Sequence, residues 1–247
     1  MKIIISPAKK MKEDDVLPWQ DLPAFLEKTD RLLAAMRAMP AARLKSLWKC
    51  SDAIAEENLR RLERMDLRRG LSPAILSYEG IQYRYMAPDV FTDREFAYLQ
   101  EHLRILSGFY GLLRPFDGVT PYRLEMQAKL AVDGAKDLYA FWGADLARVL
   151  AQDAGWVLDL ASKEYSDAVA KHLPPSVRLV RCVFGEEQEG RVVEKGTLCK
   201  MARGEMVRYM AEMDAERPED LPAFGRLGYR FSPARSTENV LVFLRNG

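Results

Sequence analysis

Two segments of this chain carry hydroxyl and cationic side chains that could bind an anion. The first is the loop Ser6-Pro7-Ala8-Lys9-Lys10, which directly follows the β-branched run Ile3-Ile4-Ile5. A serine hydroxyl can hydrogen-bond to a phosphate, a lysine attracts one, and ligands of α/β sheets commonly bind beyond the carboxyl ends of strands. Ser6, Lys9 and Lys10 are therefore candidate anion ligands, although a turn with solvated lysines explains the same residues.

The second segment runs from Leu106 to Met126 and has neither helical nor strand periodicity. It mixes backbone-forcing glycine and proline with tyrosine, arginine and glutamate. This composition is typical of a rigid, irregular wall facing an anionic or aromatic ligand, because arginine can fork onto a phosphate while tyrosine supplies stacking area or a hydroxyl. An Arg–Glu pair with tyrosines that pin a long loop explains it as well. The candidate residues here are Tyr110, Arg114, Tyr122, Arg123 and Glu125.

Ser162 and Glu164 lie where an expected strand over 156–160 gives way to a helix. Ser162 fits the N-cap position and Glu164 is a favourable charge in the first turn, so a structural role explains both. A helix N-terminus that follows a strand is also an anion site. Both residues are therefore candidates for a ligand role.

The helix expected over 197–213 has a basic face. Lys200, Arg203 and Arg208 fall within an arc of about 140°, at about 100° per residue. Such a face is often only solvated, but Arg203-Gly204 invites the close approach of a backbone or a ligand, which makes the three cations candidate phosphate contacts. The opposite side is expected to pack on the core through Met206, Met210 and Met213.

Several other kinds of chemistry have little support. The two histidines, His102 and His172, lack ligand spacing, and no GxGxxG, GxxxxGK[ST] or GxSxG pattern occurs, so neither a metal site nor a cofactor is expected. The three cysteines form no CxxC pair, which argues against a disulfide framework. Cys50 could sense peroxide only if its thiolate were stabilised, which spacing cannot show.

The bulk composition fits a soluble globular protein. The 247 residues are 48% hydrophobic and 30% charged, which suffices for one large domain. No stretch approaches the roughly 20 apolar residues of a membrane span, and the N-terminal apolar run is too short for a signal peptide. We therefore expect a cytoplasmic protein. We also expect a monomer. With 37 basic and 36 acidic side chains, any DNA binding must come from local clustering.

The periodicity predicts a mixed α+β domain. Buried strands are expected at 2–5, 105–108, 156–160, 177–184, 191–194, 229–231 and 240–244, and helices at 22–36, 41–49, 51–65, 92–102, 137–151, 162–172 and 197–213. The run 74–78 could be a strand or one helical turn. No linker or repeat divides the chain. We expect a single compact domain over 1–247, with a mixed β-sheet core flanked by helices and a helical N-terminal subregion at about 20–67.

Six blocks in this order closely resemble the signature blocks of the peroxide stress protein YaaA family. They are Ile4-Ile5-Ser6-Pro7-Ala8-Lys9, Leu106-Ser107-Gly108-Phe109-Tyr110-Gly111-Leu112-Leu113-Arg114-Pro115, Pro121-Tyr122-Arg123-Leu124-Glu125-Met126, Lys136-Asp137-Leu138-Tyr139-Ala140-Phe141-Trp142-Gly143, Leu160-Ala161-Ser162-Lys163-Glu164-Tyr165 and Ala202-Arg203-Gly204. Because the blocks span essentially the whole chain, the protein is identified as a member of this family.

The resemblance implies a compact α+β fold particular to the family, a basic cleft that binds duplex or branched DNA, and a role in limiting free iron and oxidative damage during peroxide stress. It also implies a helix-hairpin-helix-like element, here at about 51–61 with Arg60 and Arg61. Glu56 and Glu57 stand where such a hairpin favours glycine and an apolar residue. Two carboxylates beside phosphates are repulsive, which weakens this element as a DNA clamp.

Three functional hypotheses follow. The leading one is sequence-independent DNA binding, in which Lys9, Arg114, Arg123, Lys200 and Arg203 contact phosphates while Tyr110 and Tyr122 touch sugars or bases. The alternative is an enzyme that acts on a nucleotide-like or small anionic substrate, with an acid or base among Ser6, Tyr122, Glu125, Ser162 and Glu164. The third, direct iron binding, has no visible ligand cluster. An extended basic row would favour DNA, and a small pocket would favour the enzyme.

Overall fold

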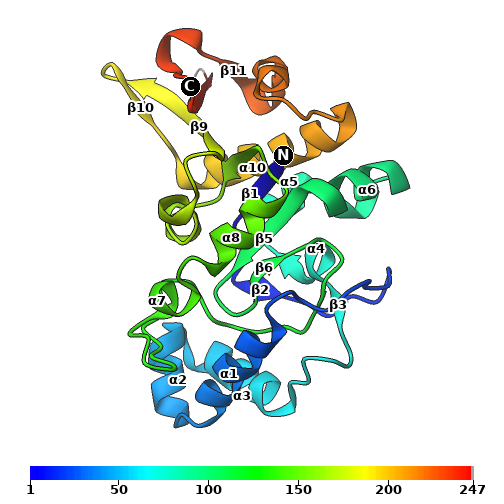
Figure 1. Ribbon diagram of the computed structural model, residues 1–247, viewed down its shortest axis with the longest axis vertical. Coiled ribbons are helices and arrows are strands. Elements are labelled where there is room, and N and C mark those ends of the chain that lie inside the picture. The colour runs from blue at the N-terminus through cyan, green and yellow to red at the C-terminus, as the bar shows by residue number, and fades with distance from the viewer. Residues whose placement is uncertain (246–247) are drawn as a thin grey trace.

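Strand β1 (Lys2–Ile5) lies at the centre of the main sheet (Figure 1). In this computed structural model, which describes residues 1–245, β1 pairs in parallel with β5 (Leu103–Ser107) on one side and with β8 (Trp156–Leu160) on the other. The side chains of Ile3, Ile4 and Ile5 are fully buried, as expected for a central strand with both faces covered. The predicted strand at 2–5 is confirmed.

The sheet continues on both sides of these three strands. Beyond β8 lie β9 (Arg178–Gln188) and β12 (Val240–Arg245), both parallel, and then the antiparallel edge strand β11 (Tyr229–Phe231). Beyond β5 lies the antiparallel strand β6 (Gly111–Leu113). The order is β11-β12-β9-β8-β1-β5-β6, with β10 (Arg191–Val193) paired to β9. This mixed sheet confirms the predicted α+β class.

Helices flank the sheet. Helix α6 (Asp93–His102) contacts β1 and β5, and α10 (Gly196–Met213) packs on α5 (Ile81–Met86) and α6. Helix α8 (Asp145–Gln152) lies on the other side of β1 in Figure 1. Among residues 1–245, none of the helices has the length and apolar character needed to cross a membrane.

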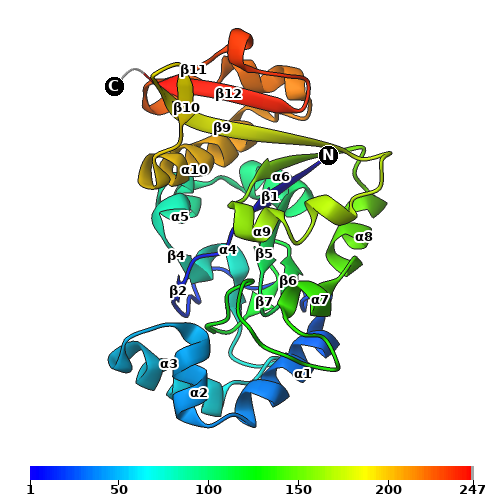
Figure 2. The same cartoon turned by 90° about the vertical axis from the view of Figure 1, so that its left-hand side faces the viewer.

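The N-terminal helices form a group at one end of the molecule. They are α1 (Leu26–Arg37), α2 (Ala41–Trp48) and α3 (Asp52–Arg64), at the bottom of Figures 1 and 2, whereas β9, β11 and β12 lie at the top. Short elements connect this group to the sheet: β2 (Lys10–Met11) pairs with β4 (Tyr78–Glu79), and β3 (Ser72–Pro73) pairs with β7 (Gly118–Val119). All three helices lie within the range of about 20–67 in which a helical subregion is expected.

Several predicted boundaries are wrong. The helix expected at 137–151 is broken at Gly143, whose positive φ of 51° ends α7 (Leu138–Trp142) before α8 begins. The helix after Ser162 stops as α9 (Lys163–Ser166), and a 3-10 turn follows at Ala170–His172. The segment without periodicity holds β6 and β7, because strands of two or three residues are too short to show alternation.

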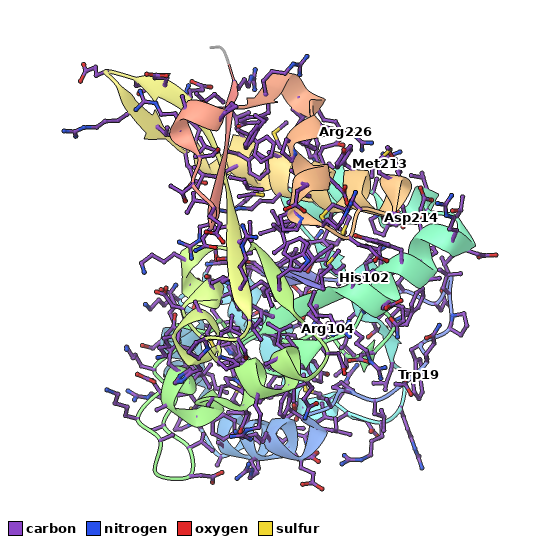
Figure 3. The ribbon with its side chains drawn as sticks, turned by 45° about the horizontal axis from the view of Figure 1, so that its top comes forward. Trp19, His102, Arg104, Met213, Asp214 and Arg226 are labelled. Atoms are coloured by element: carbon purple, nitrogen blue, oxygen red, sulfur yellow. The ribbon has the colours of Figure 1, made fainter. Side chains whose placement is uncertain are left out.

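The structure also decides the conformation of the run 74–78 and the burial of the methionines on α10. The run 74–78 is a helical turn, α4 (Ala74–Ser77), followed by β4. On α10, Met206 and Met210 are buried as predicted, but Met213 is 63% exposed. The last turn of this helix extends into solvent at Met213 and Asp214 (Figure 3). The apolar spacing of the helix therefore extends past the residues that pack on the core.

Gly204 allows α10 to cross α5 at very short range. A Cβ atom at this position would lie 2.2 Å from the carbonyl oxygen of Gln82 and 2.8 Å from the amide nitrogen of Met86. Any side chain larger than hydrogen would push the two helices apart. The predicted close approach at Arg203-Gly204 is therefore that of a backbone, and it fixes how α10 is rotated against its neighbours.

We predict that Gly204→Ala lowers the free energy of unfolding by about 3 kcal/mol, because the new methyl group overlaps backbone atoms of α5. Urea denaturation followed by circular dichroism measures this change. Gly196→Ala, in the first turn of the same helix and with no atom within 4 Å of its Cβ, is the matched control and should change stability by less than about 1 kcal/mol. Equal losses in both variants would contradict the role of the crossing.

Candidate anion-binding site

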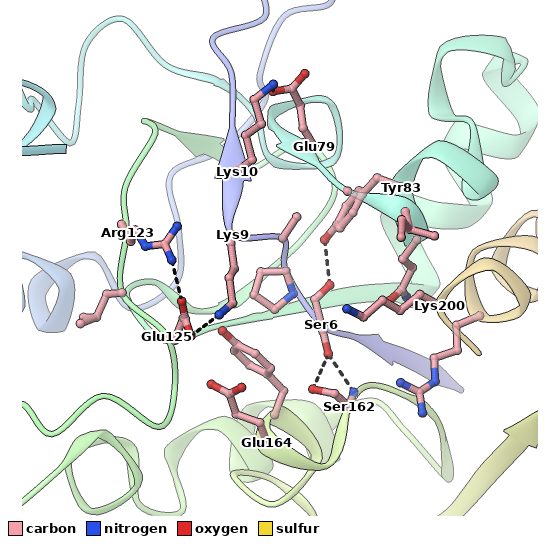
Figure 4. Close-up of a pocket in the computed structure, with 18 of the residues that line it drawn as sticks. Ser6, Lys9, Lys10, Glu79, Tyr83, Arg123, Glu125, Ser162, Glu164 and Lys200 are labelled. Atoms are coloured by element: carbon pink, nitrogen blue, oxygen red, sulfur yellow. Dashed lines mark hydrogen bonds and ion pairs between the residues drawn. The ribbon is translucent and has the colours of Figure 1, made fainter. Parts of the chain in front are cut away.

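A cavity of about 470 Å³ opens at the carboxyl ends of β1 and β8 (Figure 4). After β1 the chain continues to β5 on one side, whereas after β8 it continues to β9 on the other. Loops that leave neighbouring parallel strands in opposite directions create a crevice at the sheet edge, which is where open α/β sheets bind ligands. The strand order therefore accounts for the position of the cavity.

The ends of β1 and β8 are joined by two serines. The backbone N–H of Ser162 donates to Ser6 Oγ (2.8 Å), and the Ser6 hydroxyl donates to Ser162 Oγ (3.1 Å). Tyr83 of α5 donates its hydroxyl proton to the Ser6 carbonyl (3.0 Å). Ser162 occupies the predicted N-cap position of α9, but its side chain makes no capping bond. Its hydroxyl is held at the cavity by Ser6 instead.

Five cationic and three acidic side chains line the cavity. The carboxylates of Glu79 and Glu125 accept ion pairs from Lys10 (2.9 Å) and Lys9 (2.9 Å). Lys200 reaches toward Ser6 from α10 in Figure 4 and forms no ion pair in the described part of the chain. Arg203 pairs with Glu194, which lies outside the lining (3.5 Å). Within the lining the cations outnumber the carboxylates, and the cavity favours an anion. The cations are Lys9, Lys10, Arg123, Lys200 and Arg203, and the acids are Glu79, Glu125 and Glu164.

Glu125 and Glu164 have different surroundings. Glu125 accepts from both Lys9 (2.9 Å) and Arg123 (3.3 Å). Glu164 forms no such pair among residues 1–245 and accepts a backbone hydrogen bond from Gln127 (3.1 Å). Burial, together with the nearby charge of Glu125, raises the pKa of the Glu164 carboxyl above its ordinary value, and Lys9 opposes this shift. Glu164 thus holds its proton to a higher pH than an exposed glutamate.

Three buried N–H donors of the cavity walls have no hydrogen-bond acceptor. They are Nε of Arg123, Nε of Arg203 and Nε2 of Gln82. The two arginine side chains are only 11% and 15% exposed. An unpaired buried donor costs about 1–3 kcal/mol, and such groups are rare in native proteins. These donors therefore favour a ligand that brings several acceptor oxygens.

The whole-chain comparisons agree with the sequence blocks. The family model for peroxide stress protein YaaA matches residues 1–235. The chain belongs to the peroxide stress protein YaaA family. A UPF0246 protein of Desulfitobacterium hafniense is 52% identical over 246 residues, which cover 99% of this chain and 98% of the relative. A UPF0246 protein of Agathobacter rectalis is 50% identical over 246 residues, covering 99% of both chains. The family name supports a role in peroxide stress.

In this YaaA-family protein, most of the predicted candidates converge on one cavity. Of the residues singled out in the sequence, ten line it, although they lie as far apart in the chain as Ser6 and Arg203. They are Ser6, Lys9, Lys10, Tyr122, Arg123, Glu125, Ser162, Glu164, Lys200 and Arg203. All five residues of the enzyme hypothesis are among them.

Tyr122 contributes to the wall of the cavity through its ring. Its hydroxyl is engaged by Ser107 Oγ (2.6 Å) and Tyr78 Oη (3.0 Å), and burial raises its pKa to about 12. Tyr110 lies outside the cavity, is fully buried, and accepts a hydrogen bond from the backbone of Thr120 (3.1 Å). Both tyrosines therefore stabilise the segment between β5 and residue 126.

Four predicted cations also lie elsewhere in the YaaA-family chain. Arg208 pairs with Glu212 on the outer part of α10 (2.8 Å). Arg114 pairs with Asp21 (3.0 Å) and lines a second cavity. Arg60 and Arg61 line a third cavity of about 240 Å³ on α3, where Arg61 pairs with Glu57. The basic side chains thus form separate groups.

Sequence reasoning missed the part of the wall contributed by α5 and the residues before it. Glu79, Gln82, Tyr83 and Tyr165 line the cavity but had no assigned role. Tyr165 lies within one of the family blocks, which was the only signal for it. Gln82 and Tyr83 reach the site because α10 packs on α5, and a pairing between helices so distant in sequence leaves no local pattern.

The cysteine thiols of the described residues include two that are buried. Cys182 and Cys199 are buried, and burial raises the pKa of each thiol, so neither is a ready nucleophile. Cys50 is partly exposed. Among residues 1–245, no group of three or more His, Cys, Asp or Glu side chains is arranged to hold a metal ion.

We predict that the pKa of Glu164 responds to both of its charged neighbours. Glu125→Gln should lower it, because a like charge is removed, and Lys9→Met should raise it further. Carbon-13 NMR of the side-chain carboxyl measures both shifts, with the distant Arg148→Gln as control. Because the pKa of Glu164 is higher in the folded protein than in the unfolded chain, the free energy of unfolding should fall as the pH rises from the unfolded-state pKa to the folded-state pKa. Glu164→Gln removes this titration and should make the decline less steep. A pKa at or below the ordinary glutamate value would contradict this assignment.

Proposed function

We propose that this protein binds DNA as part of the peroxide stress response and thereby helps limit intracellular free iron and oxidative DNA damage. The observation that carries the proposal is the set of unpartnered N–H donors on Arg123, Arg203 and Gln82 in a cavity with excess positive charge. A phosphate offers several acceptor oxygens and negative charge at the same place. The family name supports the link to peroxide stress, and the link to free iron is what the resemblance to this family implies.

The size of the cavity favours one nucleotide of the DNA. A volume of about 470 Å³ lies within the range of small-ligand pockets, and five cations around it cannot form the long row that a straight duplex groove requires. A nucleotide that is unpaired or turned out of the helix fits such a pocket. Because turning out a paired base costs a few kcal/mol, irregular or branched DNA is the favoured partner.

A neighbouring basic group can contact the flanking backbone. The third cavity contains Arg60, Arg61 and Arg64 of α3. Two chain segments run from the first cavity to the third. In one segment, residues 9 and 10 line the first cavity and Glu13 lines the third. In the other, residues 122 and 123 line the first cavity and residues 120 and 121 line the third. The two cavities are therefore adjacent, and phosphates next to a bound nucleotide can reach the arginines of α3. Such contacts position DNA without reading its sequence.

We predict that Lys200→Gln and Arg203→Gln each weaken DNA binding and lower the slope of log affinity against log salt by about one, since each removes one phosphate contact. Fluorescence anisotropy with a labelled duplex measures both quantities. The same duplex carrying one bulged nucleotide should bind at least about tenfold more tightly, because its base is already unstacked.

Arg208→Gln is the matched control for this experiment. Arg208 lies on the same helix but pairs with Glu212 away from the cavity, so its loss should leave both the affinity and the salt slope within error of the parent protein. Equal effects at 200, 203 and 208 would indicate a diffuse basic surface. Absence of saturable binding at low salt would overturn the proposal.

A second candidate function is catalysis on a small anionic or nucleotide-like substrate. The observation that favours it is the pair of carboxylates with different surroundings, since Glu125 is held by two cations while burial raises the pKa of Glu164. Paired groups with different proton affinities can serve as base and acid. The joined hydroxyls of Ser6 and Ser162 lie in the same cavity.

This alternative predicts turnover of a free nucleotide or nucleoside. Incubation with nucleosides and nucleoside monophosphates, followed by chromatography, detects any cleaved base, sugar or phosphate. Glu164→Gln should lower kcat at least about a hundredfold if the group acts as a general acid, while Lys200→Gln should mainly raise KM. No product with any of these compounds would remove the alternative.

A further inference from the structure

A second cavity lies at the opposite end of β1. It has a volume of about 710 Å³ and opens at the amino ends of β1 and β5, beside α6. Its cationic side chains are Lys2, Arg104 and Arg114. Lys2 begins β1 and Ser6 follows its end, so the strand itself, at about 3.3 Å per residue, separates the two cavities. The second cavity is a different location from the candidate anion-binding site.

The register of the strands forces these three cations together. Ile4 pairs with Arg104 across β1 and β5, and Lys2 precedes Ile4 by two residues, so Lys2 and Arg104 lie on the same face of the sheet. The antiparallel register that pairs Ile105 with Leu113 brings Arg114 next to Arg104. Like charges on neighbouring strands repel one another, which is costly unless an opposite charge compensates them.

Lys2 and Arg104 lack an ionic partner within residues 1–245. Lys2 is only 8% exposed, and its ammonium donates to the carbonyl of Glu101 (2.9 Å). Arg104 (Figure 3) uses one terminal nitrogen for the carbonyls of Gln100 (3.2 Å) and Leu103 (2.7 Å). Burial and the neighbouring cations lower the pKa of both side chains. The carboxylates of Asp153 and Glu101, and for Arg104 also that of Asp117, oppose this shift without forming an ion pair with either cation. The two partly desolvated cations therefore have only neutral acceptors in direct contact.

The acidic groups near the cavity are engaged or stand farther away. Arg114 is already held by Asp21 (3.0 Å) and Asp117 (3.4 Å). Asp93 and Glu101 of α6 line the cavity but form no ion pair with Lys2 or Arg104. Lys2 and Arg104 are therefore the two cations of this cavity without a carboxylate in direct contact among residues 1–245, and a dianion could contact both.

The remaining wall combines Gln20 and Gln100 with an apolar surface. Phe96 and Phe116 meet edge to face with ring centroids 5.2 Å apart, and both line the cavity. Leu17, Pro18 and Ala97 complete this lining. The segment before α1 is fixed over it, because the backbone N–H of Gln20 donates to the carbonyl of Phe116 (2.8 Å). The cavity therefore has a cationic end and an apolar wall.

We infer that this cavity is a second binding site, for a phosphate monoester with an apolar or aromatic body, whose phosphate is held by Lys2 and Arg104 while the body packs on Phe96 and Phe116. A phosphate monoester carries close to two negative charges near neutral pH, one for each cation without a direct ion pair. The arginine supplies a planar fork and the lysine a point charge for its oxygens. The inference is independent of DNA binding at the first cavity.

Titration of the full-length protein with phenyl phosphate, followed by amide NMR, tests the inference. Signals of residues 96–104 and 114–118 should shift, and Lys2→Met and Arg104→Gln should each weaken binding at least tenfold. Inorganic phosphate, which has no ring, should bind more weakly than phenyl phosphate, and benzyl alcohol, which has no charge, should not bind. Lys2→Arg should retain binding, because it keeps the charge on an intact fold.

The controls separate this site from the first cavity and from DNA. Lys200→Gln, in the first cavity, and the exposed Arg148→Gln should leave the shifts at residues 96–104 unchanged. Phenyl phosphate should raise the melting temperature of the parent protein but not that of Lys2→Met. Shifts confined to residues near Ser6 and Ser162, unchanged affinity in Lys2→Met, or shifts at 96–104 caused by duplex DNA but not by phenyl phosphate would each overturn the inference.

Discussion

The parallel pairing of β1 with β5 on one side and β8 on the other is the constraint on which the rest of the structure depends. Parallel strands align their carboxyl ends, so Ser6 and Ser162 meet there and hydrogen-bond to each other in the wall of the first cavity. The same register aligns the amino ends, where Lys2 and Arg104 lie on one face of the sheet, two positions apart along the strands. Both candidate sites therefore result from one set of backbone hydrogen bonds.

The two cavities compensate positive charge differently. In the first, Glu125 lies between Lys9 and Arg123, and Glu79 pairs with Lys10, so part of the charge is neutralised within the protein. The first cavity also has N–H donors on buried arginines without a hydrogen-bond acceptor. In the second, Arg114 is paired with Asp21 and Asp117, whereas Lys2 and Arg104 directly contact only backbone carbonyls. A phosphate group would satisfy either cavity, by hydrogen bonding in one and by charge in the other.

Much of this could be predicted from local patterns, and the failures have clear causes. The strands at 2–5 and 156–160 are mainly apolar, with only Lys2 and Asp159 as charged residues, and the helix at 93–102 begins at a capping box formed by Thr92 and Glu95. The predicted helix at 137–151 failed because Gly143 adopts a positive φ that its neighbours do not signal. Strands β6 and β7 were missed because their partners, β5 and β3, supply the hydrogen bonds that define them.

By itself, the sequence determined the family, the α+β class, the central strands and the residue types that could bind an anion. Only the tertiary structure decided which of those residues act together. Helical periodicity places Lys200, Arg203 and Arg208 on one arc, but the contact of Gly204 with α5 fixes the rotation of α10, so the first two line the cavity while Arg208 pairs with Glu212. Periodicity records which residues share a face of a helix, whereas the packing of distant segments decides what that face meets.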